Sequence, residues 1–238
     1  MIVSKSDTRV ESMNRPNSLQ WIQFWYEETA MQLKSGICLV ALLVSTTLAG
    51  CGSGPLTVQE QFNQDQASAE AMAGRLAGLE NSAFAIFVDA GQVTYNGYAG
   101  VVVVTADEAT ALLGEARIVA DFDTSVVTGS MTNFVGATAP VTQVETPAAV
   151  AYAGTLTLRN GLVDGPNRPN QFGADFAGRL TGQGNVIAID GAMIGDFRGG
   201  PLRNGIVGES TVGTTTATLN GDAADGSLEI LAEADRDF

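Results

Sequence analysis

The segment Ala116-Arg117-Ile118-Val119-Ala120-Asp121-Phe122-Asp123 alternates between apolar and polar side chains. In an extended chain, successive side chains point to opposite faces. One face therefore carries Ile118, Ala120 and Phe122, and the other carries Arg117, Asp121 and Asp123. A strand with one dry face and one wet face is typical of an antiparallel sheet that covers a single core.

The same texture continues on both sides of this segment, where short runs rich in Val, Ile, Thr, Phe and Tyr alternate with Gly, Asn, Asp and Pro. We predict eight strands, over residues 93–104, 115–122, 125–134, 152–158, 173–180, 185–194, 205–212 and 227–233. Residues 123–124 and 181–184 are predicted to form hairpin turns. Residues 135–151 and 160–172 are predicted to form long loops.

Eight antiparallel strands without an intervening helix favour closure, because closure removes exposed sheet edges. We therefore expect an all-β fold, a single eight-stranded antiparallel up-and-down β-barrel. A membrane-spanning barrel is the less favoured alternative. It would need aromatic girdles at the strand ends, and the chain has no tryptophan after Trp25.

Residues 31–51 have the pattern of an export signal, whereas the thirty residues before them do not. A short start with Lys34 precedes an apolar stretch at 37–44, too short to span a bilayer stably, and small residues lead to Cys51. Leu48-Ala49-Gly50-Cys51 resembles the lipobox of bacterial lipoproteins, which implies that Cys51 carries a lipid and becomes the first residue after cleavage. An ordinary secretory signal is the alternative. Because Gly52 rather than Asp follows the cysteine, the analogy implies passage to the outer membrane of a Gram-negative cell.

These features divide the chain into four parts. Residues 1–30 are interpreted as an over-extended start, 31–50 as a lipoprotein signal peptide, 51–92 as a tether and 93–238 as the barrel domain. Within the tether, residues 67–79 could form a short helix. Met72, Leu76 and Leu79 would then lie on one face.

The composition excludes several functions. From Cys51 onward the chain has 22 acidic residues against 8 arginines and no lysine, which disfavours nucleic acid and anionic lipid as partners. Histidine is absent, Cys38 lies in the signal and Cys51 is assigned to the lipid. Ser-His-Asp triads, Cys-His nucleophiles and His- or Cys-based zinc sites are therefore excluded. We expect no enzyme activity, no cofactor and no metal centre.

Two groups of charged residues are candidate sites. Asp121 and Asp123 share a strand face, and Asp89, Asp107 and Glu108 are near in sequence; clustered oxygens suit a hard cation, but the favoured interpretation is a solvated outer face.

Arg198 and Arg203 bracket Gly199-Gly200-Pro201 and could bind a carboxylate or an acidic patch of a partner. The alternative is a turn whose arginines offset Asp196 and Glu209.

Several motifs together resemble the barrel domain of transferrin-binding protein B and related surface lipoproteins. They are Tyr95-Asn-Gly97, Ala120-Asp-Phe122, Val127-Thr-Gly129, Asn133-Phe134, Gly154-Thr-Leu-Thr-Leu158, Phe176-Ala-Gly-Arg-Leu180 and Gly195-Asp-Phe197-Arg-Gly-Gly-Pro201. The resemblance implies a monomeric, non-enzymatic lipoprotein at the cell surface whose barrel loops bind a host or environmental protein, or haem, for nutrient acquisition. A structural envelope lipoprotein without a soluble ligand is the alternative.

Overall fold

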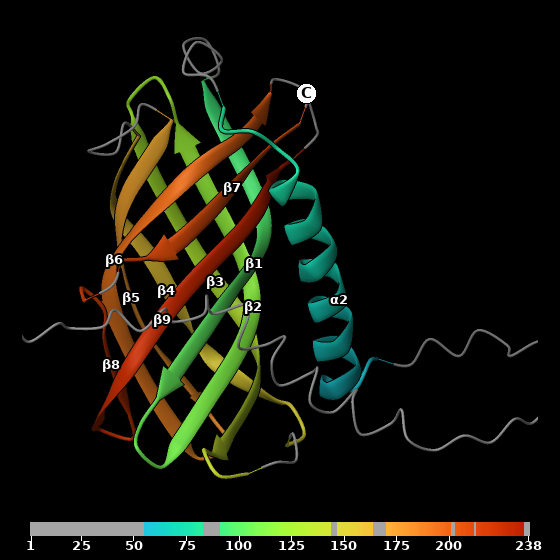
Figure 1. Ribbon diagram of the computed structural model, residues 1–238, viewed down its shortest axis with the longest axis vertical. Helices are drawn as coiled ribbons and strands as arrows, with labels where there is room; N and C mark the ends of the chain where they lie inside the picture. The colour runs from blue at the N-terminus through green and yellow to red at the C-terminus, as the bar shows by residue number, and fades with distance from the viewer. Residues whose placement is uncertain are drawn as a thin grey trace, which may run out of the picture.

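The computed structural model describes residues 55–82, 91–143, 147–163, 170–200, 203–211 and 213–235 (Figure 1). The helix and the strands in these ranges are α2 (Val58–Ala77), β1 (Gln92–Val104), β2 (Glu108–Asp121), β3 (Val126–Pro140), β4 (Val150–Val163), β5 (Gln171–Gly182), β6 (Asn185–Gly200), β7 (Arg203–Ser210), β8 (Thr216–Leu219) and β9 (Asp222–Ala234).

The strands form a closed antiparallel barrel, as the sequence predicts. Each strand from β1 to β6 pairs with the next, β7 pairs with β9, and β9 closes the barrel by pairing with β1. The additional strand β8 does not add a ninth position. It lies between the first halves of β6 and β9, and β7 lies between their second halves, so the two short strands share the eighth position.

Several strands are longer than predicted, and the two predicted long loops are correspondingly shorter. β3 continues to Pro140, and β4 extends from Val150 to Val163. Asn133 and Asn160 have positive φ values of 55° and 52°, and the strand register shifts beside each of them. These β-bulges interrupt the apolar alternation without ending the strand, which explains why sequence periodicity stops too early.

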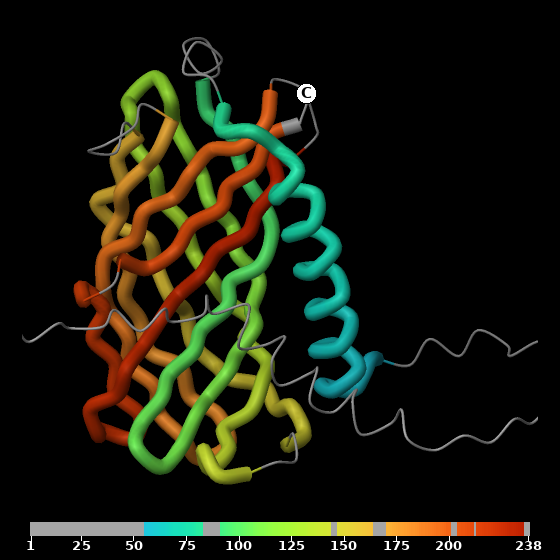
Figure 2. Tube along the Cα trace, viewed as in Figure 1, coloured from blue at the N-terminus to red at the C-terminus, as the bar shows by residue number. Residues whose placement is uncertain are grey.

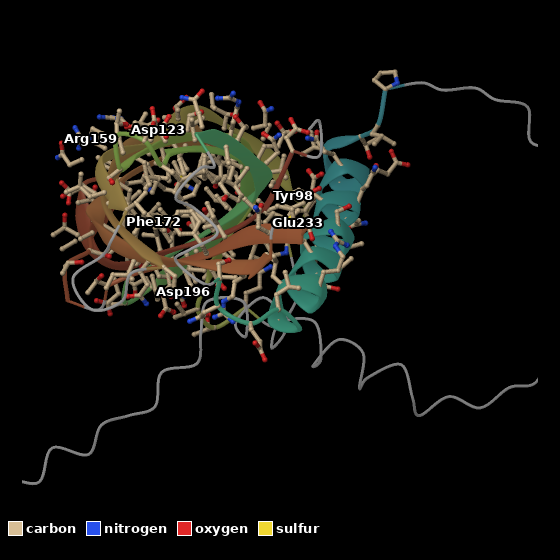
Figure 3. The ribbon with its side chains drawn as sticks, turned by 90° about the horizontal axis from the view of Figure 1, so that it is seen from above. Tyr98, Asp123, Arg159, Phe172, Asp196 and Glu233 are labelled. Atoms are coloured by element: carbon tan, nitrogen blue, oxygen red, sulfur yellow. The ribbon has the colours of Figure 1, made fainter. Side chains whose placement is uncertain are left out.

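The interior of the barrel is filled by apolar side chains from all parts of the sheet. The largest fully buried ones include Tyr95, Phe134, Phe172, Phe176, Phe197, Ile118, Met131, Leu156, Leu180 and Ile187. Figure 3 looks into the barrel and shows Phe172 inside the wall. Gly195 provides the space for that ring, because a Cβ atom there would overlap the edge of Phe172.

A small hydroxyl network is buried among these side chains. Thr138 Oγ1 lies 2.7 Å from Thr110 Oγ1 and 2.8 Å from the hydroxyl of Tyr152. The buried hydroxyl groups are therefore satisfied by one another, as buried polar groups must be.

Helix α2 is longer than the predicted 67–79 segment and packs lengthwise on the outer wall (Figure 1). It begins with a capping box in which Thr57 Oγ1 accepts from the Glu60 N–H and the Glu60 carboxylate accepts from the Thr57 N–H. Met72 and Leu76 are buried against Leu231 of β9. Within the described residues, no helix has the length and apolar character needed to cross a membrane.

A glycine makes the close approach of this helix possible. A Cβ atom at Gly205 would overlap the Leu76 side chain, so β7 can accept Leu76 only without a side chain of its own. Arg75 adds a bidentate ion pair with Glu233 of β9, with nitrogen–oxygen distances of 2.8 and 2.9 Å. The helix is therefore part of the folded domain.

The barrel has two distinct ends (Figure 2). The lower end carries the turns 105–107, 183–184 and 220–221, the described parts of the β3–β4 loop (141–143 and 147–149) and the start of α2. The upper end carries the turn 122–125 and the C-terminal ends of β4, β6 and β9.

Candidate functional site

Arg198, the described member of the predicted arginine pair, lies at the upper end on β6. Its Nη2 atom is 3.4 Å from Asp196 Oδ2, and the two side chains are 27% and 21% exposed. Asp196 also accepts a 2.7 Å hydrogen bond from Gln171 on β5. The guanidinium is therefore paired within the chain, as expected if it offsets Asp196, but its Nε atom is buried without a partner.

The chain that follows α2 fixes the backbone around Arg198. The N–H of Ser82 donates to the carbonyl of Phe197 at 2.9 Å, and the N–H of Gly199 donates to the carbonyl of Glu80 at 2.8 Å. Asn81 forms an isolated antiparallel bridge with Arg198. The end of β6 is thus hydrogen-bonded to β7 on one side and to residues 80–82 on the other.

Arg203 begins β7, and its backbone pairs with Gly200. The strand pairing therefore brings Arg203 to the same end of the barrel as Arg198. The side chain of Arg203 lies outside the described part of the structure.

A cluster of aromatic rings lies inside the barrel next to the end of β6. The ring of Phe197 is 5.3 Å from that of Phe122, 5.5 Å from that of Phe172 and 6.0 Å from that of Tyr95, all in tilted arrangements. These offset contacts are favourable for aromatic pairs. The cluster is a packed core that supports the upper end.

Two further buried side-chain atoms in this region have no hydrogen-bond partner. They are the hydroxyl of Tyr95 and the Oδ1 atom of Asn204. Burial raises the pKa of the Tyr95 hydroxyl well above its usual value, because the phenolate would lose its hydration. Tyr95 is therefore a neutral core residue and has none of the features of a general base.

The outer surface of the upper end carries an apolar pair. Val126 and Leu162 are directly opposite each other on β3 and β4, and they are 39% and 58% exposed. Each stands beside a buried apolar residue, Val127 or Val163, so alternation alone does not show which of the two neighbours faces outward. Leu162 also lies in a segment that the sequence predicts as a loop. Only the strand pairing brings them together.

The acidic residues considered for a cation site are separated by the fold. Asp107 and Glu108 lie at the lower end, where β2 begins, whereas Asp121 and Asp123 lie at the upper end, where it finishes. Asp121 accepts a hydrogen bond from the N–H of Thr124 and stabilises the turn. Asp89 is outside the described residues. Within the described ranges, no three Asp, Glu, His or Cys side chains are grouped so that they could hold a metal ion.

Cys51, the predicted lipidation site, also lies outside the described residues. The described chain begins at Pro55, close to the N-cap of α2. Comparison of the chain with protein-family models, with curated proteins and with solved structures found no match. The functional argument therefore depends on the residues and their arrangement.

Proposed function

We propose that this protein is a non-enzymatic lipoprotein of the outer membrane, anchored through Cys51, that binds a protein or a haem-type ligand at the upper end of its barrel. The observation that carries the proposal is the position of α2. Its start, only a few residues after Cys51, lies at the lower end, and its packing on the wall fixes that arrangement. A lipid at Cys51 would attach the barrel near its lower end and leave the upper end open to a partner.

The distribution of side chains supports a barrel that works in water. The interior is apolar, whereas charged residues such as Glu115, Asp175 and Arg179 are exposed on the outer wall. Membrane-spanning barrels have the reverse pattern, with an apolar band outside. Attachment of a water-facing barrel to a membrane requires a separate anchor, and the lipid at Cys51 would provide it.

The filled interior also favours surface binding over enclosure of a ligand. The described core is packed with aromatic and aliphatic side chains. A partner would contact side chains at the upper end. The described candidates are the exposed Leu162 and Val126 and the partly exposed Arg198, and backbone pairing brings Arg203 to the same end. The resemblance to the barrel of transferrin-binding protein B agrees with this mode of binding.

The anchor is tested by growing cells with a palmitate analogue and comparing the full chain with a Cys51→Ser variant. We expect label in the first and none in the second. Binding is tested with the immobilised mature chain, probed with haemin and with candidate haem- or metal-carrying proteins. We expect Leu162→Asp and Arg198→Glu to weaken binding at least about tenfold, which is about 1.4 kcal/mol, and the lower-end variant Val141→Ser to have no effect.

The proposal fails if the mature chain binds none of these probes and deletion of the gene leaves nutrient uptake unchanged. That outcome would favour the second candidate, a structural envelope lipoprotein. Protease treatment of intact cells separates the two further, because a chain at the cell surface is digested and one on the periplasmic side is protected.

A further inference from the structure

Large apolar side chains are exposed at the lower end of the barrel. Leu56 and Val58 at the start of α2, Val104 at the end of β1 and Val141 after β3 are between 36% and 57% exposed. The other exposed large apolar residues of the described chain are Val126 and Leu162 at the upper end. Single exposed apolar residues need no explanation, but several on one surface mark an interaction site.

Hydrogen bonds join the segments that carry these residues. The side-chain oxygen of Gln59 in α2 accepts from the N–H of Ala149 in the β3–β4 loop at 2.8 Å. In the same loop, the N–H of Val141 donates to the carbonyl of Asp107 in the β1–β2 turn, also at 2.8 Å. One described part of the loop (147–149) is therefore joined to the start of α2, and the other (141–143) to the β1–β2 turn, at the same end of the barrel.

The chain between Cys51 and this surface is short. Thr57 is six positions after Cys51, and a fully extended chain of that length spans roughly 20 Å. The capping box fixes the start of α2 at Thr57, and the Leu76 and Arg75 contacts hold the helix on the barrel. A lipid attached at Cys51 would keep the lower end within that distance of the bilayer.

The charge of this end restricts the type of lipid. The described turns and loop of the lower end contain Asp107 and no arginine or lysine. Anionic headgroups attract basic residues, so this surface has nothing with which to bind them. Binding to neutral, zwitterionic headgroups does not require basic residues, and apolar side chains can enter the interface between headgroups and acyl chains.

We infer that the lower end, comprising Leu56, Val58, Val104 and Val141, is a membrane-docking surface that rests on zwitterionic lipid. The inference rests on the lipid anchor of the proposed function and extends it, because the anchor alone would let the barrel tumble. Docking fixes the barrel axis and presents the upper end to partners. The lipid contributes attachment, and these side chains contribute orientation.

The test uses the lipidated mature chain in phosphatidylcholine vesicles. Because the lipid occupies Cys51 and Cys38 is removed with the signal, an introduced cysteine is the only free thiol. An environment-sensitive fluorophore is attached at Ala106→Cys in the lower-end turn, or at Thr124→Cys in the upper-end turn as the matched control. Spin-labelled phosphatidylcholine then reports proximity to the bilayer.

We expect severalfold stronger quenching at position 106 than at position 124. A second variant, which combines Leu56→Ser, Val58→Ser and Val141→Ser, should bring quenching at position 106 down to the level of the control. Replacing a third of the lipid with phosphatidylglycerol should weaken the quenching at low salt. Equal quenching at the two positions, or no effect of the three serines, would overturn the inference.

Failure of the anchor is recognised separately. Mass spectrometry of the mature chain shows whether Cys51 carries lipid, and an unmodified cysteine would contradict the proposed function. In that case orientation is measured with a chain whose residues before Gly52 are replaced by a histidine tag held on nickel-chelating lipid. Preferential quenching at position 106 would still support the docking surface.

Discussion

Two tyrosines inside the barrel differ in the hydrogen bonding of their hydroxyl groups, so the same substitution to phenylalanine should change stability in opposite directions. The Tyr152 hydroxyl is bonded to Thr138, whereas the Tyr95 hydroxyl is buried without a partner. Tyr152→Phe should lower the free energy of unfolding by about 1 kcal/mol, the usual net value of a hydrogen bond. Tyr95→Phe should leave it unchanged or raise it, because the substitution removes an unsatisfied buried group. Urea unfolding of the mature chain measures both, and equal losses would contradict the assignment.

At the residue scale, alternation predicts the barrel interior well and the bulges poorly. Ile118 and Ala120 are fully buried in the core, as their spacing predicts. Phe122, predicted on the same strand face, lies in a turn and still packs against the core. Asn133 and Asn160 are bulge residues. Their side-chain amides donate hydrogen bonds to the carboxylates of Glu115 and Asp175 on neighbouring strands. That role depends on partners that are distant in sequence, so periodicity cannot reveal it.

At the scale of elements, the docking of α2 depends on the fit of Leu76 against Gly205. Leu76→Ala should lower the free energy of unfolding by about 2–5 kcal/mol, the range for buried leucines. Gly205→Ala should also destabilise the domain, because the new Cβ would overlap Leu76 and lie 2.7 Å from the carbonyl oxygen of Ala232. In the Leu76→Ala background, the glycine substitution should cost less, since one of the two clashes is gone.

The matched control for that cycle is Gly100→Ala, because a Cβ atom at Gly100 meets no atom within 4 Å. Urea unfolding of the four chains gives the coupling energy. Strict additivity of Leu76→Ala and Gly205→Ala would show that the helix is not held by this contact.

The same helix carries a carboxylate that is unfavourable in the folded protein. Burial, and secondarily the charge of Glu115, raise the pKa of Asp65 above its usual value. A carboxyl group whose pKa is higher in the folded state destabilises the fold once the pH exceeds that pKa. Asp65→Asn should therefore raise the free energy of unfolding at pH 7, and the gain should vanish near pH 3. Urea unfolding at both pH values checks this, and a gain of equal size at pH 3 would indicate a different cause.

Element prediction from sequence succeeds for the eight main strands and fails for β8. The missed strand is four residues long, and Asn220-Gly221 follows it, with φ values of 57° and 94°. An Asn-Gly pair between alternating residues is a strong hairpin signal, so this turn could have been predicted. The full length of α2 could not, because its first half has few apolar residues and depends on the Thr57 cap and on contacts with the barrel.

At the scale of the whole molecule, closure of the barrel follows from the number of strands and their alternation, whereas the candidate surfaces do not. Strand pairing places Val126 and Leu162 directly opposite each other, and the docking of α2 brings Leu56 to the same end of the barrel as Val141. Such surfaces cannot be predicted from the sequence, because their residues are distant in the chain and a single exposed apolar residue is common. The arginine pair is partly predictable, since a short turn must bring Arg198 and Arg203 to one end.

The charge of the whole molecule leads to a last prediction. From Cys51 onward, 22 acidic residues face 8 arginines, and two of those arginines, Arg75 and Arg198, are engaged by carboxylates. The compact barrel brings the excess carboxylates closer together than the unfolded chain does, so their repulsion lowers the stability of the fold. Salt at about 0.1 M screens charges beyond roughly 10 Å. Raising NaCl from about 0.02 to 0.3 M should therefore raise the thermal midpoint by a few degrees, and the rise should be smaller for a chain in which exposed Asp107, Asp222 and Asp225 are replaced by Asn. A midpoint that falls with salt in both chains would mean that attractive ion pairs outweigh the repulsion.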